Sequence, residues 1–169
     1  MRAKTIIPSF EALFMKAPQK IKDYINKCKD IPQRPDFHPE GNTWIHIHIV
    51  YDRAQAFGDL DHALAAFFHD LGKVDTTAPN KHGSYSAYGH ELVSADLVKE
   101  FSNWIEELGG HTDVVYNIVK KHMKIKLLDN MRKSKQEILK QDLYFNELIQ
   151  FSKFDTMETL TNDELNRYK

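Results

Sequence analysis

The sequence predicts an all-α fold: a single helical bundle of about seven helices that spans residues 1–169. Apolar residues recur at three- and four-residue spacing along most of the chain, as they do on the buried face of a helix. The alternation that marks strands never lasts for more than a few residues, and no segment repeats. With 169 residues and 41% hydrophobic content, the chain can bury one core. We assign residues 1–35 to N-terminal packing helices and a connector, and residues 36–159 to the core of the bundle.

The composition excludes several classes of protein. The net charge of −1 creates no overall field that would draw the chain to nucleic acid or membrane, so any phosphate binding must be local. The single cysteine, Cys28, excludes a disulfide framework and a thiolate zinc site. No apolar run approaches the ~20 residues of a membrane span, and no signal core follows Met1 to Lys4. We therefore expect a cytoplasmic protein with no membrane or disulfide partner, and leave its oligomeric state open.

The first segment supplies packing elements and a connector. Ser9 is placed to cap a short helix over residues 10–15, and Pro18 to open a second helix that runs through Ile25. Residues 31–42 hold three prolines and a glycine, which indicates an irregular connector.

Thr43 is then expected to cap a helix that runs to about Phe57, with His48 outside its inward face. That face reads His46, Ile49, Val50, Arg53, Ala54 and Phe57. Gly58 ends this helix, Asp59 caps the next, and Gly72 is the expected C-terminal stop of that next helix.

The end of the helix that begins after Asp59 carries two polar residues where apolar ones are expected. Residues 63–68 are apolar without a break, and His69 and Asp70 follow directly. An unpaired polar group buried at such a place costs roughly 2–7 kcal/mol, and an isolated charge costs far more. A divalent cation bound by both side chains would compensate for this cost. A capping aspartate beside a satisfied core histidine is the alternative.

The second half of the chain places further polar side chains on apolar faces. Residues 75–86 are polar and loop-like, and helices are expected over residues 88–104 and 112–122. Residues 131–141 suit a solvated turn or short helix, and a final helix is expected over 143–160. The inward faces of the three longer helices read His90, Ser94 and Leu97; Val115, Ile118, Val119 and His122; and Leu148, Phe151 and Asp155.

Five elements thus direct potential metal ligands inward: His46, His69 with Asp70, His90, His122 and Asp155. One inward histidine is usually a satisfied core residue, but five elements are hard to explain as independent accidents. Nitrogen and oxygen ligands without sulfur favour Mn²⁺, Co²⁺, Ni²⁺, Fe²⁺, Zn²⁺ or Mg²⁺, and spacing does not choose among them. Such an ion would lower the pKa of bound water from about 15.7 toward about 7 and polarise a phosphoryl oxygen.

The order of these residues resembles the ligand order of the HD-domain metal-dependent phosphohydrolases. The match is closer to the C-terminal HD domain of bacterial CCA-adding tRNA nucleotidyltransferases, and it covers roughly residues 35–159. It is carried by Phe37-His38-Pro39-Glu40, His69-Asp70-Leu71-Gly72-Lys73, Gly89-His90-Glu91 and Ile118-Val119-Lys120-Lys121-His122. The nucleotidyltransferase head is missing from this sequence, so we expect a freestanding HD domain without CCA addition.

The resemblance implies metal-dependent 2′,3′-cyclic phosphodiesterase, 2′-nucleotidase or phosphatase activity. It also implies one or two divalent ions. The first would be held by His46, His69, Asp70 and Asp155, and His90 and His122 would complete a second ion or contact the phosphate.

Three further residues are candidates for substrate binding. Lys73 would neutralise a phosphate oxygen, or else simply lie at a helix C-terminus, where the dipole favours a cation. Arg53 is first an internal ion-pair partner and second a phosphate clamp, and His82 lies on a loop that could line the mouth of the site. The other histidines are expected on the surface or in loops: His38, which could also line the mouth, His48, His62 and His111.

We therefore expect a hydrolase that cleaves a phosphoester of a nucleotide or RNA end with activated water. Asp70 would orient the water, Lys73 would offset charge on the phosphate, and His90 or His122 would protonate the leaving oxygen. Two alternatives stay open: a (deoxy)nucleoside 5′-phosphate or triphosphate hydrolase, and a non-catalytic, metal-stabilised nucleotide-binding module. A helical interaction domain with ordinary core histidines is a third.

Overall fold

The computed structural model describes residues 6–169, so the expectation about Met1 to Lys4 lies outside the described residues. The predicted all-α class is confirmed. The helices are α1 (Phe10–Lys16), α2 (Gln19–Lys27), η1 (Cys28–Asp30), α3 (Thr43–Phe57), α4 (Leu60–Phe68), α5 (Lys73–Thr76), α6 (His90–Glu100), α7 (Ser102–Glu107), α8 (Thr112–Lys126), η2 (Leu128–Asn130), α9 (Lys133–Lys140), α10 (Phe145–Asp155) and α11 (Asn162–Asn166). Two short strands, β1 (Ala78–Pro79) and β2 (Tyr85–Ser86), pair antiparallel.

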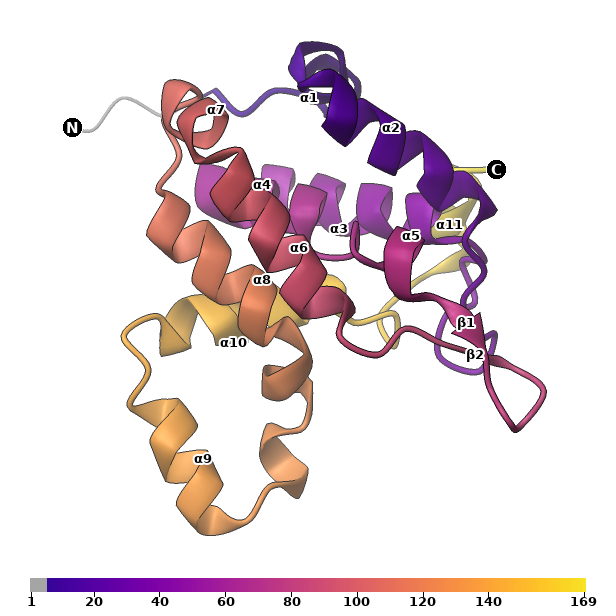
Figure 1. Ribbon diagram of the computed structural model, residues 1–169, viewed down its shortest axis with the longest axis vertical. Coiled ribbons are helices and arrows are strands. Elements are labelled where there is room, and N and C mark those ends of the chain that lie inside the picture. Colours follow the sequence, from indigo (N-terminus) through magenta and orange to yellow (C-terminus); the bar gives the residue numbers. More distant parts are fainter. Residues whose placement is uncertain (1–5) are drawn as a thin grey trace.

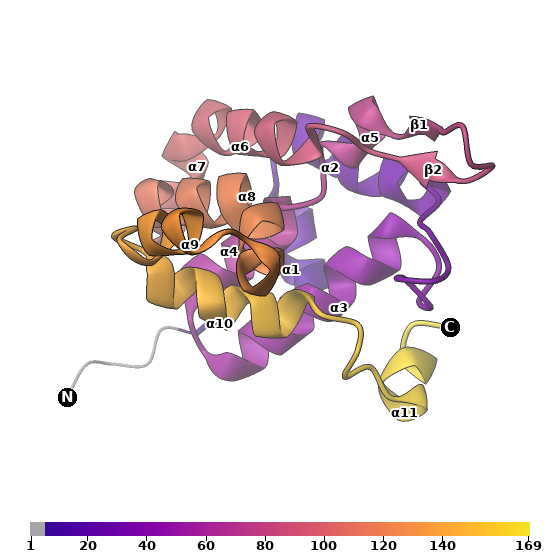
Figure 2. The ribbon, with the colours of Figure 1, turned by 90° about the horizontal axis from the view of Figure 1, so that it is seen from below.

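The centre of the bundle is formed by α3, α4, α8 and α10, with α6 packed along α8. Figure 1 shows α6 and α8 side by side, with α3 crossing behind them and α1 and α2 covering one end. Seen from below, α6, α8 and α10 lie in successive layers (Figure 2). The largest fully buried side chains include Tyr51, Phe67, Phe68 and Phe151, so α3, α4 and α10 all contribute to one core.

Capping side chains explain where several helices begin. Ser9 Oγ accepts a hydrogen bond from the Ala12 N–H, and Asp59 Oδ1 caps α4, both as predicted. The cap predicted for α3 is wrong by one residue. Asn42 Oδ1 accepts from the Ile45 N–H at 2.9 Å, and Thr43 is the first helical residue.

Several predicted helix ends are wrong, and the estimate of about seven helices is too low. The helix expected over 88–104 breaks at Phe101 into α6 and α7, and the one expected over 143–160 ends at Asp155. In contrast, α8 continues one turn beyond His122. Residues 75–86 are not entirely loop, since they contain part of α5 and the β1–β2 hairpin.

The prediction that Gly72 ends a helix is wrong. The α4 helix ends at Phe68, and Gly72 has φ of −60°, which every residue type can adopt. The glycine is required for space, because a Cβ at this position would lie 2.1 Å from the His90 carbonyl oxygen. Its N–H also donates to Ser94 Oγ at 2.8 Å. The turn that carries His69 and Asp70 therefore packs closely against the first turns of α6.

The inward faces predicted for the long helices are buried, with two exceptions: Arg53 is only partly buried, and Phe57 is exposed. Phe57, the last residue of α3, is 55% exposed. Cys28 is buried, and burial raises the pKa of its thiol. Among residues 6–169, no helix has the length and apolar character needed to cross a membrane.

Candidate metal centre

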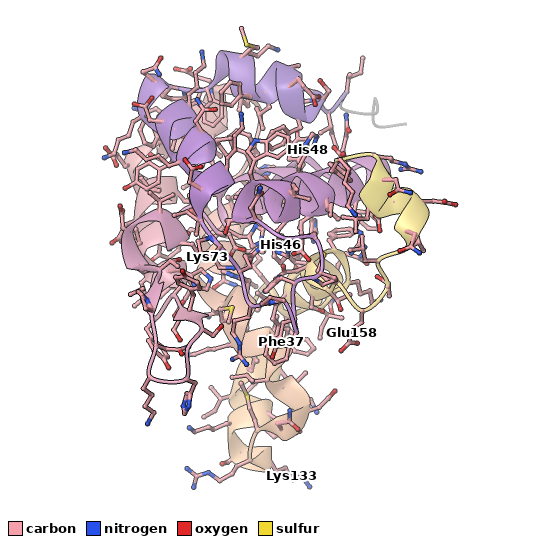
Figure 3. The ribbon with its side chains drawn as sticks, turned by 90° about the vertical axis from the view of Figure 1, so that its right-hand side faces the viewer. Phe37, His46, His48, Lys73, Lys133 and Glu158 are labelled. Atoms are coloured by element: carbon pink, nitrogen blue, oxygen red, sulfur yellow. The ribbon has the colours of Figure 1, made fainter. Side chains whose placement is uncertain are left out.

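Six of the predicted site residues come together at the middle of the bundle. Each is at most 4% exposed. Figure 3 shows the bundle from the side, with His46 near its middle. The six are His46 from α3, His69 and Asp70 from the turn after α4, His90 at the start of α6, His122 from α8, and Asp155 at the end of α10.

All four imidazoles are fixed through Nδ1. In three of them Nδ1 donates to the backbone carbonyl three residues earlier: His69 to Ala66 O at 2.7 Å, His90 to Ala87 O at 2.9 Å and His122 to Val119 O at 2.6 Å. In the fourth, His46, Nδ1 is 2.8 Å from Glu40 Oε1. A carbonyl or carboxylate oxygen accepts here, so Nδ1 holds the proton and Nε2 of the neutral ring presents a lone pair.

The first group of ligand atoms surrounds the facing oxygens of Asp70 and Asp155. His46 Nε2 lies 2.8 Å from Asp155 Oδ1 and 3.5 Å from Asp70 Oδ2. His69 Nε2 lies 3.4 Å from each of the same two oxygens. Ligand atoms of His46, His69 and Asp70 are all within 4.8 Å of one another.

A second group shares Asp70 through its other oxygen. Asp70 Oδ1 lies 3.1 Å from His90 Nε2 and 3.4 Å from His122 Nε2, and the two Nε2 atoms are 3.2 Å apart. These three residues also offer ligand atoms within 4.8 Å of one another. The Asp70 carboxylate therefore lies between the two groups.

These residues fit a divalent metal ion. The His69 Nε2 is buried without a hydrogen-bond partner among residues 6–169, although it faces two carboxylates. The Nε2 lone pairs of His90 and His122 face each other at 3.2 Å. Convergent lone pairs and carboxylates repel each other unless a cation lies between them, and the set of nitrogen and oxygen donors suits a first-row divalent metal.

Both central acids are ionised at neutral pH. Burial raises the pKa of Asp70, but His69, Lys73, His122 and His90 together bring it well below its ordinary value. Burial acts in the same way on Asp155 and is again outweighed, first by Lys126.

The pKa values of His122 and His46 shift in opposite directions. Burial lowers the pKa of His122 to about 4, so the ring is neutral at pH 7 and its Nε2 offers a lone pair rather than a proton. Burial also tends to lower the pKa of His46, but its hydrogen bonds with Asp155 and Glu40 outweigh burial and raise it. A proton on His46 Nε2 then bonds Asp155 Oδ1 where a metal ion would otherwise lie.

The sequence reasoning missed Glu40 as a functional residue. Glu40 is 4% exposed, and its Oε1 accepts from His46 Nδ1 at 2.8 Å and from His38 Nδ1 at 2.9 Å. Burial raises the pKa of Glu40, but these two hydrogen bonds outweigh it and lower the pKa to about 2. Its position in the Phe37-His38-Pro39-Glu40 motif was the only signal in the sequence. His38 lies at the rim, with a side chain 19% exposed.

Two lysines contact the carboxylates of the centre and are more exposed than the six residues that form it. Lys73 Nζ lies 2.9 Å from Asp70 Oδ2 and donates to Gln33 Oε1 at 2.8 Å. Lys73 is the first residue of the single-turn helix α5 and follows the end of α4 by five residues. Lys126, which the sequence reasoning missed, lies with Nζ 2.8 Å from Asp155 Oδ2. The Lys73 side chain is 13% exposed and the Lys126 side chain 34%.

The structure does not bring Arg53 or His82 to the centre. The Arg53 Nε and Nη2 donate to the Glu164 carboxylate at 2.8 and 2.7 Å. Its Nη1 donates to the carbonyls of Phe154 and Thr156. These contacts match the ion-pair interpretation of Arg53 and engage all three of its guanidinium nitrogens. His82 is exposed in the turn between β1 and β2.

Two histidines expected at the surface are buried instead. His48 is 8% exposed and stacks on Phe10 with 4.2 Å between ring centroids. His62 is 4% exposed, and its Nε2 lies 3.2 Å from the Glu147 carbonyl oxygen. His111 is exposed, as expected.

Comparison with known proteins gives one family and partial relatives. The HD domain family model matches residues 43–146. The chain is 38% identical over 84 residues to the multifunctional CCA protein of Aromatoleum aromaticum, covering 49% of this chain and 20% of that protein. It is 32% identical over 120 residues to the multifunctional CCA protein of Burkholderia mallei, covering 69% and 24%.

The chain thus spans a quarter or less of the length of these relatives. No solved structure matches the chain. Because the family model covers more than half of its length, this protein belongs to the HD domain family, whose members are in general metal-dependent hydrolases.

Proposed function

We propose that this protein hydrolyses a phosphoester of a nucleotide or RNA end, as a 2′,3′-cyclic phosphodiesterase, 2′-nucleotidase or phosphatase. One observation carries the proposal: four anchored imidazoles direct Nε2 at two buried, ionised carboxylates. Membership of the HD domain family supports a metal-dependent hydrolase. The resemblance to the HD domain of CCA-adding enzymes supports the nucleotide or RNA-end substrate.

The ligand assignment follows the two groups of donor atoms. His46, His69, Asp70 and Asp155 would hold one divalent ion, and Asp70, His90 and His122 would hold a second. A bound ion of this kind makes water acidic enough to act as a nucleophile at neutral pH and withdraws charge from a phosphoryl oxygen. Mn²⁺, Co²⁺, Ni²⁺, Fe²⁺, Zn²⁺ and Mg²⁺ are the candidates.

The two lysines are proposed to bind the phosphate. Lys73 and Lys126 each contact one of the proposed ligand carboxylates and are more exposed than that carboxylate. An ammonium group there is placed to pair with a phosphate oxygen beside the centre and to offset the charge that develops on it. Asp70 is proposed to orient the attacking water. If only the first ion is bound, His90 is free of a ligand role and is proposed as the proton donor to the leaving oxygen, because the low pKa of His122 does not suit that role.

A substrate panel tests the proposal. The purified protein, supplied in turn with Mn²⁺, Co²⁺ or Ni²⁺, is assayed on 2′,3′-cyclic, 2′-, 3′- and 5′-nucleotides and on nucleoside triphosphates. We expect turnover of the cyclic and 2′ substrates and its loss in Asp70→Ala. Asp96→Ala, an exposed carboxylate on α6, is the matched control and keeps full activity.

The alternatives give different results. Preference for 5′-nucleotides or triphosphates would indicate the 5′-phosphate or triphosphate hydrolase. Tight binding of metal and nucleotide without phosphate release would indicate a binding module. Absence of bound metal by elemental analysis, together with no turnover, would refute the proposal.

A further inference from the structure

Positive charge is concentrated in one segment of this nearly neutral chain. Residues 120–140 contain eight lysines and arginines against two acids, a net charge of +6, although the whole chain carries −1. The remaining residues therefore carry −7. We call residues 120–140 the basic arm. It comprises the last two turns of α8, η2 and α9.

The basic arm extends away from the bundle. In Figure 1, α9 projects beyond α8 and α10. Figure 3 places Lys133 at the far tip of this projection, well separated from His46 and Lys73. Only Leu139 of α9 is buried. Because α9 contributes so little to the core, its charged side chains are not explained by packing.

Half of the eight cations in the arm are available to a ligand. Lys124, Arg132, Lys133 and Lys135 are exposed and form no ion pair with any residue in 6–169. Lys121 pairs with Asp142, and Lys140 lies 3.7 Å from Glu137. An unpaired run of like charges repels itself, so it favours a polyanionic partner.

The arm is continuous with the candidate metal centre. Lys126 belongs to the arm and also lies 2.8 Å from Asp155 Oδ2. It follows His122 by one helical turn on α8. A mononucleotide at the centre would reach Lys126 and Lys73 but not the tip of α9, so the distal cations suit a ligand with several phosphates.

We propose that the basic arm binds the phosphate backbone of a single-stranded RNA whose terminal phosphoester lies at the metal centre. This inference rests on the proposed function and narrows its substrate from a free nucleotide to a polynucleotide end. Backbone binding of this kind depends on counterion release, so it weakens steeply as salt rises.

The test uses the triple variant Arg132→Gln, Lys133→Gln, Lys135→Gln of the full chain. The control is Lys16→Gln, Lys22→Gln, Lys27→Gln, which removes the same charge from α1 and α2 at the other side of the molecule. Binding of a fluorescently labelled oligoribonucleotide is measured by anisotropy over a range of salt concentrations. Hydrolysis of a 2′,3′-cyclic mononucleotide and of an oligonucleotide with the same end is measured in parallel.

We expect the arm variant to bind the oligonucleotide about tenfold or more weakly and to show a salt slope lower by about 2, since each phosphate contact on a single strand contributes about 0.7. Its kcat/KM on the mononucleotide should equal that of the wild type, and the control should bind RNA normally. Equal RNA affinity in both triple variants would overturn the inference. So would arm-dependent binding to phosphatidylserine vesicles without arm-dependent binding to RNA.

The failure of the proposed function would look different. If the wild type hydrolyses neither substrate with any metal, the proposed function is refuted, while the anisotropy measurement still decides whether the arm binds RNA. If the mononucleotide is hydrolysed and the arm variant loses nothing on the oligonucleotide, the proposed function stands and the arm inference fails.

Discussion

Replacing Glu40 by Gln tests whether the carboxylate behind His46 tunes the metal centre. The substitution keeps the shape of the side chain and a carbonyl oxygen that can still accept the two imidazole N–H bonds, now at 2.8 and 2.9 Å. What it removes is the negative charge, which the buried Glu40 holds because its pKa is about 2. The His46 ring therefore keeps its orientation and loses basicity.

The expected effect on metal affinity is large enough to measure. Hydrogen bonds to charged groups contribute about 1.5–3 kcal/mol and neutral ones about 0.5–1.5, so the bond to His46 weakens by about 1–2 kcal/mol. Complete loss of a hydrogen-bonded partner behind a ligand typically costs about 10–100-fold in metal affinity, and the 1–2 kcal/mol expected here corresponds to about 5–30-fold. We expect Mn²⁺ binding, measured by isothermal titration calorimetry, to weaken within this range in Glu40→Gln.

Two comparisons separate tuning from a purely structural role. Glu100→Gln, an exposed carboxylate paired with Lys20, is the matched control and should bind metal normally. The thermal unfolding midpoint of the metal-free Glu40→Gln protein measures folding alone, because no metal is bound in that experiment. It therefore shows whether the substitution also changes the stability of the apoprotein. Unchanged Mn²⁺ affinity in Glu40→Gln, whatever its midpoint, would refute the reasoning.

Three further predictions concern stability. Gly72→Ala forces a Cβ to 2.1 Å from the His90 carbonyl, so we expect a loss of about 1–3 kcal/mol in urea unfolding; an unchanged midpoint would contradict this packing. Glu164→Gln breaks the paired bonds from Arg53 and should cost about 1–2 kcal/mol with KM unchanged, whereas a raised KM would return Arg53 to the substrate site. The hydrogen bond from Arg53 lowers the pKa of Glu164 from 4.5, so this pair stabilises fully above about pH 4.5 and loses its effect as pH falls through the lower folded-state value; the wild type should therefore lose more unfolding free energy than Glu164→Gln between pH 5 and 3.

The long helices were predictable because their periodicity persists over several turns. The inward stripes of α3, α8 and α10 match the buried residues except at Arg53 and Phe57. The break at Phe101 carries no proline or glycine, and the two-residue strands are too short to show alternation. Helix ends and short elements were therefore the parts that a periodic pattern could not locate.

The six residues that meet at the candidate metal centre could be predicted to lie close together because each is a polar side chain at an inward position. Glu40 lies on an irregular connector, where no period marks a buried side, and Lys126 lies in a lysine-rich run that resembles a solvated face. His48 was misjudged because α3 is covered on two sides. One face of α3 carries His46 to the candidate metal centre. His48 lies on another face, where its ring stacks on Phe10 of α1.

Burial alone does not distinguish a ligand histidine from a core histidine in this protein. His62 is as buried as His90, but its Nε2 faces the Glu147 carbonyl and must donate, so that nitrogen has no lone pair for a metal. In His69, His90 and His122 the carbonyl three residues earlier takes the Nδ1 proton, and Nε2 is left to face an acid. The position of the proton, which depends on the backbone beneath each ring, therefore decides which buried imidazoles can bind an ion.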